Sequence, residues 1–535
     1  MPEPIRLLTL TLVAWLGLVA CGGGGASPDA ASAAAVAATA QSPGTIALAA
    51  PGADTAPGTV PASSTPSTPP AQPASSASSA SSASSASPAS PPAASTGLPP
   101  LAAPILPRSG LVAADLAVLV AQGDATSEAI ARAYQLARAI PEANMIRLPV
   151  PGGSDVIGEA AFAVLKAAID ARLPATAQAT LVTWTQPSRV QGACSMGITS
   201  ALAFGFSASQ CGGCSRTAAS AYFDSDSSRP FDDLGIRPSM MLGTPTLAAA
   251  QALIARGVAA DGSQPAGTGH LLRTADAARS VRYPDWLTLP TAWATAPGLA
   301  LRYTDASAAS AASASASATT PTATATANAD TAISNQTDVL FYFTGLATVP
   351  LLASNRFLPG AAADHLTSFG GLLPGANGQM PATDWLAAGA TASYGTVEEP
   401  CNHTEKFPKA SVLIEHYLRG ATLIEAYWKS VAWPGQGLFV GEPLARPWSQ
   451  PPQAVIDGNA LVVSSRSLRR NSIYRVDFRP YGGTAWAPLA TMTAGQPRPV
   501  TWRVPLPADP AGGHLRWMGP CATQPALLCV LAQSN

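Results

Sequence analysis

A thiol and an imidazole stand two residues apart in the stretch Glu398-Glu-Pro-Cys-Asn-His403. If this segment is extended, Cys401 and His403 point to the same side of the chain. An imidazole beside a thiol can take up its proton and later protonate a leaving group, which is the chemistry of a thiol hydrolase. Glu398 or Glu399 could orient the ring, and His365 is an alternative partner for the same thiol. The pattern therefore allows a cysteine nucleophile at Cys401.

Ser368 is a second candidate nucleophile, because it follows His365 by three residues. Residues three apart on one regular strand point to opposite faces of the sheet. A Ser-His pair would therefore need a bulge or a turn between the two residues. A serine hydrolase stays an alternative on that condition.

Disulfide pairing competes with both kinds of catalysis. Six cysteines remain once Cys21 is set aside, and an even number suits an exported protein. The Cys211-Gly-Gly-Cys214 spacing also suits tetrahedral zinc, with Cys194 and Cys401 as further ligands, and zinc is the alternative. A redox role is disfavoured, since such motifs lie at a helix N-terminus and this one is flanked by loop-like sequence. We favour two disulfides among these four cysteines, a third between Cys521 and Cys529, and no cofactor.

A cluster of carboxylates lies between residues 224 and 233. Asp224, Asp226, Asp232 and Asp233 surround Arg229. Oxygen ligands in a turn-rich loop suit Ca²⁺, but this spacing matches no EF-hand loop. We expect an ordinary solvated loop.

Alternating apolar runs and helical stripes must position these side chains. Strand-like and helical segments alternate from Leu111 onward, which is typical of a parallel sheet covered by helices. The strand-like runs are 116–120, 145–148, 179–184 and 338–343, and the helical ones are 127–139 and 154–171. The sequence therefore predicts a three-layer α/β domain with a mainly parallel sheet over residues 106–450.

The pattern changes after Pro447. Short alternating segments separated by Gly, Pro and Asn turns predict a small antiparallel β-sandwich over residues 451–535. The segments are 459–464, 473–478, 499–504, 515–517 and 527–531. We expect this part to pack against the main domain.

The order of the runs in the main domain resembles that of gingipain-type cysteine peptidases, which have a caspase-like fold. In that family one strand ends in His-Gly, the next delivers the nucleophilic Cys, and a late strand ends in Gly-Asp-Pro. Here the first of these strands ends in Thr344-Gly345, and the run 364–371 offers Ser368-Phe369. The late strand ends in Gly441-Glu-Pro443. The resemblance implies a caspase-like fold that lacks the catalytic His/Cys pair.

The chain also resembles a family of uncharacterised bacterial envelope lipoproteins that are distantly similar to those peptidases. The matching segments are 140–144, 183–187, 237–240 and 389–408. The resemblance implies no particular reaction. The leading hypothesis is a non-catalytic binding or assembly module for a protein, peptide or glycan ligand. The alternative is a peptidase-like hydrolase whose nucleophile has moved to Cys401 or Ser368.

We expect the functional surface around residues 389–408. In open α/β sheets ligands bind outside the carboxyl ends of the strands, where the loops converge. Parallel strands would bring His365, Glu399 and His403 into one cleft at that edge. The residues expected there are Thr344, Ser368, Glu398, Glu399, Cys401, His403 and Lys406. Of these, Thr344, Glu398, Glu399 and Lys406 are the candidate binding residues.

The N-terminus predicts export. Arg6 precedes an apolar run, 7–20, that is too short to span a bilayer stably and is typical of a signal peptide. Leu18-Val-Ala-Cys21 resembles a bacterial lipoprotein box, in which the Cys carries lipid and becomes the first mature residue. By the same resemblance, Gly22 favours the outer over the inner membrane. We therefore expect a lipid-anchored outer-membrane lipoprotein with residues 1–21 as its signal peptide, periplasmic or surface-exposed.

Two segments have low complexity. Residues 22–105 are mostly Ala, Ser, Pro, Gly and Thr, so they cannot bury enough apolar surface to offset chain entropy, and we expect a disordered tether. The insertion 306–332 is Ala, Ser and Thr, and we expect a surface loop. Net charge is −1, charged residues make up 11% of the chain, and there is no basic cluster. This excludes a typical nucleic-acid-binding protein and leaves the membrane, through the lipid anchor, as the expected partner.

Overall fold

The computed structural model describes residues 98–308, 332–375, 378–495, 499–521 and 529–531. The chain divides into two compact units, Met1–Pro92 and Ala93–Asn535, and every element below belongs to the second. The predicted signal peptide, Cys21, most of the predicted tether and most of the insertion lie outside the described residues. None of the described helices is long and apolar enough to cross a membrane.

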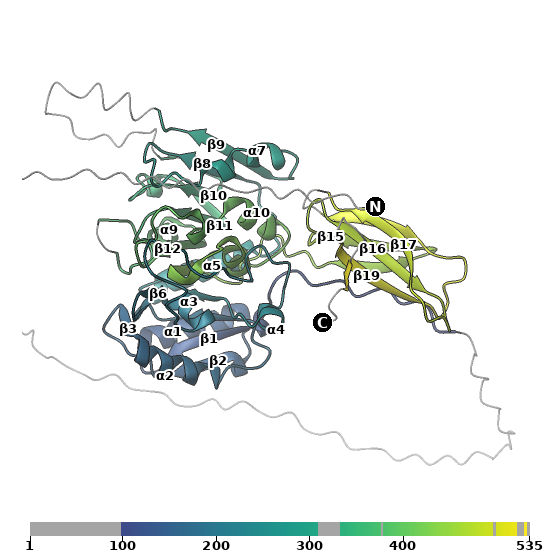
Figure 1. The fold of residues 1–535 in the computed structure, drawn as a ribbon, viewed down its shortest axis with the longest axis horizontal. Helices are drawn as coiled ribbons and strands as arrows, with labels where there is room; N and C mark the ends of the chain where they lie inside the picture. The colour runs from purple at the N-terminus through teal and green to yellow at the C-terminus, as the bar shows by residue number, and fades with distance from the viewer. Residues whose placement is uncertain (1–97, 309–331, 376–377, 496–498, 522–528, 532–535) are drawn as a thin grey trace, which may run out of the picture. The chain divides into compact units, whose positions relative to one another are not determined.

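A ten-stranded, mostly parallel sheet forms the centre of the main domain (Figure 1). Its strand order is β2-β1-β4-β7-β13-β12-β11-β10-β8-β9. The strands are β1 (Leu116–Ala121), β2 (Met145–Leu148), β4 (Ala179–Val182), β7 (Ser239–Met241), β8 (Gly267–Arg273), β9 (Leu299–Asp305), β10 (Val339–Thr344), β11 (Phe357–His365), β12 (Ala392–Thr396) and β13 (Gly437–Gly441). The predicted α/β class with a mainly parallel sheet is confirmed.

The sheet consists of two parallel halves that run in opposite directions. β12 pairs antiparallel with β13, whereas every other neighbouring pair in this sheet is parallel. One half is β2-β1-β4-β7-β13 and the other is β12-β11-β10-β8-β9. The carboxyl ends of the two sets of strands therefore lie at opposite edges.

Helices and loops cover the sheet, and β1, β10 and β13 are buried along their whole lengths. Strands buried on both faces are near-continuous apolar runs, which is why these segments were recognisable in the sequence. The helices are α1 (Ala125–Arg138), α2 (Glu159–Asp170), α3 (Ile198–Phe204), α4 (Pro230–Leu234), α5 (Leu247–Ala260), α6 (Tyr283–Trp286), α7 (Leu289–Ala292), α9 (Thr383–Ala388), α10 (Ala410–Leu418) and α11 (Leu423–Ser430). α1 packs against α5, α10 packs against α11, and α3 contacts β7 and β13.

Three small sheets accompany the large one. β3 (Val156–Gly158), β5 (Arg189–Gln191) and β6 (Ser195–Gly197) form one of them. The other two are antiparallel and lie in the C-terminal part, with strand orders β14-β15-β18 and β17-β16-β19-β20. Their strands are β14 (Gln453–Asp457), β15 (Ala460–Ser465), β16 (Ile473–Arg479), β17 (Ala487–Thr493), β18 (Val500–Pro505), β19 (His514–Cys521) and β20 (Cys529–Leu531). Leu461 and Val504 of one sheet share an apolar cluster with Val476 and Trp517 of the other.

Several predicted boundaries were wrong for local reasons. α1 begins at Ala125 because Asp124 is its N-cap and accepts the N–H groups of Thr126 and Ser127. Ser127, where the predicted helix began, lies inside α1, and its hydroxyl accepts the N–H of Ala121. α2 begins at Glu159 because residues 156–158 pair with β5.

Several strands were misplaced or missed, among them β11, β14 and β17. β11 covers Phe357–His365 and so ends near the start of the predicted run 364–371. Its segment was not recognised as a strand because it holds Pro359, Gly360 and three alanines, which are depleted in strands. β14 and β17 were not predicted. Both are largely exposed and lack a continuous apolar face.

Candidate functional site

The carboxyl ends of β10, β11 and β12 meet at one edge, as parallel pairing requires. Thr344, the last residue of β10, lies in register with His365, the last residue of β11. The loops that follow are the ones that the resemblance identified as positions of catalysis. β8 also ends at this edge, because it pairs in parallel with β10, and the segment after β8 begins here.

Arg282, from that segment, fills the centre of the edge. Its NH1 group donates to both carboxylate oxygens of Asp364, at 2.8 and 3.1 Å, and to the carbonyl oxygen of Pro408 at 3.2 Å. Its NH2 group donates to the carbonyl oxygen of Thr344 at 2.8 Å. Both charged side chains are buried. Burial raises the pKa of Asp364 to about 6, although the guanidinium acts in the opposite direction.

The Thr344-Gly345 position is closed by neighbouring backbone. The Thr344 hydroxyl donates to the carbonyl oxygen of Leu272 at 3.1 Å, so it is part of the strand pairing. A Cβ atom at Gly345 would lie 2.0 Å from the carbonyl oxygen of Arg279. Real Cβ atoms do not approach so closely, so no side chain larger than that of glycine fits here without moving the backbone.

His365 is enclosed and neutral. Its Nδ1 accepts the Trp385 Nε1–H at 2.9 Å, and its Nε2–H donates to the carbonyl oxygen of Met380 at 3.1 Å. Only the tautomer with the proton on Nε2 satisfies both bonds. Burial lowers the pKa of His365 to about 3. The ring is therefore committed to structural hydrogen bonds.

Ser368 lies just beyond the end of β11 and is half-buried. Its carbonyl oxygen accepts the Thr396 hydroxyl at 2.9 Å, which ties this turn to the end of β12. Its own hydroxyl makes no hydrogen bond with any residue that the structure describes. A serine nucleophile needs a base within hydrogen-bond reach, and His365 is turned to other partners.

All four central cysteines form disulfides. Cys194 pairs with Cys211, and Cys214 pairs with Cys401. The predicted pairing of Cys521 with Cys529 is also present. Two Cys-Cys-Glu groups have sulfur and carboxylate atoms close enough to suggest a metal site, but their sulfur atoms are those of the two disulfides. A zinc site or a Cys401 nucleophile would require these bonds to be reduced.

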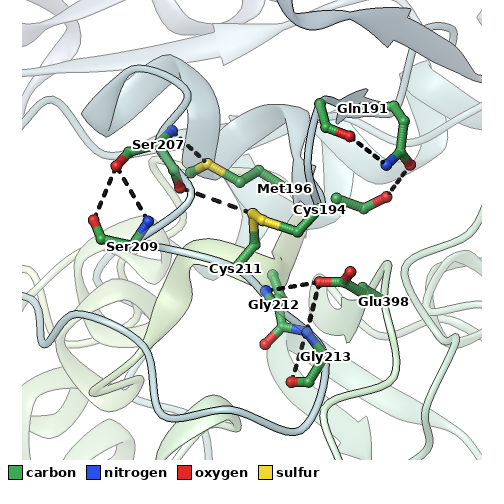
Figure 2. The surroundings of a disulfide bond; sticks show 12 residues. Gln191, Cys194, Met196, Ser207, Ser209, Cys211, Gly212, Gly213 and Glu398 are labelled. Atoms are coloured by element: carbon green, nitrogen blue, oxygen red, sulfur yellow. Dashed lines mark hydrogen bonds between the residues drawn. A yellow bond between two sulfur atoms is a disulfide. The ribbon is translucent and has the colours of Figure 1, made fainter.

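Glu398 anchors the glycines between the two disulfides (Figure 2). Its Oε2 accepts the N–H groups of Gly212 and Gly213, both at 3.0 Å. It also accepts the Gln436 side-chain N–H at 3.1 Å. The two glycines have φ of +128° and +57°, which favour glycine and turn successive N–H groups toward one carboxylate. The candidate binding residue Glu398 therefore holds its own chain.

The neighbouring candidates also bind the 211–214 loop or their own segment. Lys406 is buried and donates through Nζ to the carbonyl oxygen of Gly213. Burial lowers its pKa to about 8. The His403 Nε2–H donates to the carbonyl oxygen of Cys214 at 2.8 Å, and Glu399 accepts the N–H of Cys401 at 2.8 Å.

The expected shared cleft does not form. The structure gathers Glu398, Glu399, Cys401, His403 and Lys406 around the disulfide loop. It places His365 in a separate buried site with Trp385, and Thr344 beneath Arg282. The sequence could not reveal the Arg282–Asp364 pair, whose partners are 82 positions apart. The only hint in the sequence was the position of Asp364, an acidic residue at the end of an apolar run.

One cavity borders this region, and a second lies between the main domain and the C-terminal part. The first, of about 350 Å³, lies between segments 281–286 and 404–410, with Trp286 and Phe407 in its wall and Asp285, Glu405 and Lys409 among the polar lining. The other, of about 410 Å³, is lined by charged residues that already have partners. Its lining includes His416, Arg419 and Lys429, which bind Asp224, Asp226 and the carbonyl oxygen of Ser227 respectively.

Three of the four carboxylates of the 224–233 cluster form ion pairs, and Asp233 accepts the Ser227 hydroxyl. Asp224 and Asp226 both contact Arg469 of the C-terminal part, and Asp232 contacts Arg229. The Arg419 and Arg469 guanidinium groups oppose the effect of burial and hold the pKa of Asp226 at about 2. The loop is largely solvated, since Asp226, Asp232 and Asp233 are exposed, but its ion pairs with Arg469 also join two parts of the chain.

Comparisons with protein-family models, with curated proteins and with solved structures find no match to this chain.

Proposed function

We propose that this protein is a non-catalytic binding or assembly module built on a caspase-like, peptidase-derived α/β domain with a C-terminal β-sandwich. The observation that carries the proposal is the buried pair of Arg282 and Asp364 at the carboxyl edge of β10 and β11. A hydrolase needs an exposed nucleophile and a base that titrates near neutral pH at such an edge. Here the same place holds a structural ion pair.

Three further observations support the proposal. Cys401 is bonded to Cys214 and carries no thiol. His365 is neutral and donates or accepts only within the core. Gly345 packs directly against the Arg279 backbone, which leaves no room for substrate at that position. Each of these features stabilises the edge and removes a requirement of catalysis.

The cavity of about 350 Å³ is the best candidate for the ligand surface. It adjoins the predicted surface at residues 404–408 and is within the size range of small-molecule pockets. Aromatic rings beside exposed charges suit a protein, peptide or glycan ligand, because each offers apolar faces next to polar groups. The alternative function is a cysteine- or serine-type hydrolase acting through Cys401 or Ser368. The half-buried, unbonded Ser368 hydroxyl is the observation that favours it.

Activity-based probes distinguish the two functions. The full chain is incubated without reductant with a fluorophosphonate probe for serine hydrolases and with an electrophilic probe for cysteine peptidases. We expect no labelling above that of heat-unfolded protein. Labelling that disappears in Ser368→Ala or Cys401→Ala would overturn the proposal. Ser449→Ala is the matched control, because it removes another half-buried hydroxyl, beside Gly262.

A further inference from the structure

Helices α5 and α9 border a groove of about 400 Å³. α5 lines it with Ala249, Ala252 and Arg256, which share one helix face because they are three and four residues apart. Thr185 and Thr244, from the loops after β4 and β7, line it as well. Those loops follow the carboxyl ends of two parallel strands, where open α/β sheets bind ligands. The groove therefore lies at the other edge of the sheet, opposite the edge blocked by Arg282.

Arg256 carries a positive charge that no carboxylate of the described residues neutralises. Its NH2 group donates to the carbonyl oxygens of Leu386 and Ala390, at 2.9 and 3.1 Å, at the end of α9. Its Nε is buried and has no hydrogen-bond partner among the described residues. Burial lowers the pKa of Arg256, and no acidic neighbour opposes that effect. A partly desolvated guanidinium binds carboxylates strongly, so this part of the groove favours an anion.

Thr244 supplies a second polar group. It is only 6% exposed, it lines the groove, and its hydroxyl has no hydrogen-bond partner among the described residues. A buried hydroxyl without a partner is unfavourable, and it can both donate to and accept from a peptide group. The position therefore suits the backbone of an extended chain.

The length and lining of the groove define the ligand further. Ala249 and Arg256 are seven residues apart on α5, which is about 10 Å along a helix. Three extended peptide residues span about the same length. Leu373 and Leu386 provide an apolar wall, and the alanine side chains of α5 leave room for a backbone. Asp384, on the rim, repels an ion with two negative charges more than one with a single charge.

From this geometry we infer that the α5–α9 groove binds the C-terminal end of a short apolar peptide. The terminal carboxylate lies on the Arg256 guanidinium. A peptide group near the third residue from the end hydrogen-bonds the Thr244 hydroxyl. Apolar side chains contact Leu373 and Leu386. The inference goes beyond the proposed function and concerns a different part of the molecule from the 281–286 and 404–410 cavity.

Calorimetric titration of the full chain with N-acetyl-Ala-Leu-Ala tests the inference. The free acid should bind, and the C-terminal amide should bind at least tenfold more weakly, because the amide cannot pair with the guanidinium. Arg256→Gln should reduce the affinity for the acid by a similar factor, and Arg256→Lys by less. Thr244→Val, which keeps the shape of the side chain and removes the hydroxyl, should lower the affinity for the peptide several-fold. Arg302→Gln, at an exposed position of β9, is the matched control.

Several outcomes would overturn the inference. They are equal binding of acid and amide, the same loss in Arg302→Gln as in Arg256→Gln, and no binding of the acid at millimolar concentration. Octanoate has a carboxylate and similar length but no peptide groups. Octanoate binding that equals that of the peptide and is unaffected by Thr244→Val would refute the peptide as the ligand. If Arg256→Gln does not fold, the comparison of the acid with the amide on the native chain still shows whether the groove recognises a terminal carboxylate.

Discussion

Asp364 and His365 are adjacent in sequence, but one is buried beside a charged partner and the other beside neutral partners only. Successive residues of a strand face opposite sides of the sheet, so the carboxylate reaches Arg282 while the imidazole reaches Trp385 and Met380. The carboxylate is buried with a charge partner, and the imidazole is buried without one. A buried charge without a partner is strongly unfavourable, so His365 must be neutral in the folded protein.

The first prediction is that His365 makes the folded state sensitive to acid. Burial lowers its pKa from 6.5 to about 3, so between these values the unfolded chain binds a proton that the folded chain does not. The contribution of His365 to the free energy of unfolding is therefore fully present above about pH 6.5. It falls toward pH 3, by up to roughly 1.4 kcal/mol per pH unit. Urea unfolding at about pH 7 and pH 5 should show a smaller loss in His365→Gln than in the native chain.

The matched control for this prediction is His514→Gln, because His514 is exposed on β19. That variant should keep the native pH dependence. His416 and His270, whose pKa values burial lowers to about 3 and about 4, contribute in every variant and cancel in the comparison. An identical pH dependence in His365→Gln and the native chain would show that the imidazole is not buried in a neutral form.

At the scale of elements, local pattern predicted individual strands but not their assembly. β1, β2 and β10 were recognisable because each is a short apolar run bounded by turns. The opposite directions of the two half-sheets depend on β12 pairing with β13, a contact between residues 41 to 49 positions apart that no local pattern encodes. The predicted functional edge was therefore placed on one half-sheet, and the α5–α9 groove on the other half was missed.

The site was predictable only in part for the same reason. Cysteine spacing and number indicated two disulfides among Cys194, Cys211, Cys214 and Cys401, but connectivity depends on which loops meet. Glu398 was predicted as a candidate binding residue. Its partners, Gly212 and Gly213, come from a loop about 185 positions away. Long-range partners of this kind decide whether a polar side chain is free for ligand or is committed to structure.

The second prediction compares the two central disulfides. Cys214–Cys401 spans 187 positions and Cys194–Cys211 spans 17. If a disulfide acts mainly on the entropy of the unfolded chain, removing the longer link should destabilise by roughly 5 kcal/mol and the shorter by roughly 3 kcal/mol. Urea unfolding of Cys214→Ala/Cys401→Ala and of Cys194→Ala/Cys211→Ala measures both, each serving as the control for the other.

Mass mapping without reduction should accompany this comparison and should find no free thiol among the four cysteines. Thiols that become alkylated only after treatment with a chelator would show zinc in place of disulfides. A larger loss for the Cys194–Cys211 pair would show that local contacts around the 211–214 loop outweigh chain entropy.

At the scale of the whole molecule, the two edges of the sheet have different structures. One edge is closed by Arg282 and stiffened by two disulfides, and the other presents the α5–α9 groove. A rigid scaffold with a cavity beside one edge and a groove at the other suits binding better than turnover, since turnover requires groups that change protonation during the reaction. Where such a scaffold acts depends on its attachment, which the N-terminal sequence predicts.

The third prediction is that Cys21 attaches the protein to the membrane. Lipid added to this thiol anchors the chain, and several acyl chains hold far better than one. The part of the predicted tether before residue 98 would then set the distance to the membrane, on the order of 50 Å if it behaves as a flexible coil, because Pro99 and Ala103 already contact the C-terminal part. Cys21→Ser should move the protein from the membrane pellet to the soluble fraction and keep the mass of the precursor. Gly23→Ser, which changes the neighbourhood and keeps the thiol, should remain in the pellet, whereas unchanged partitioning of Cys21→Ser would refute the anchor.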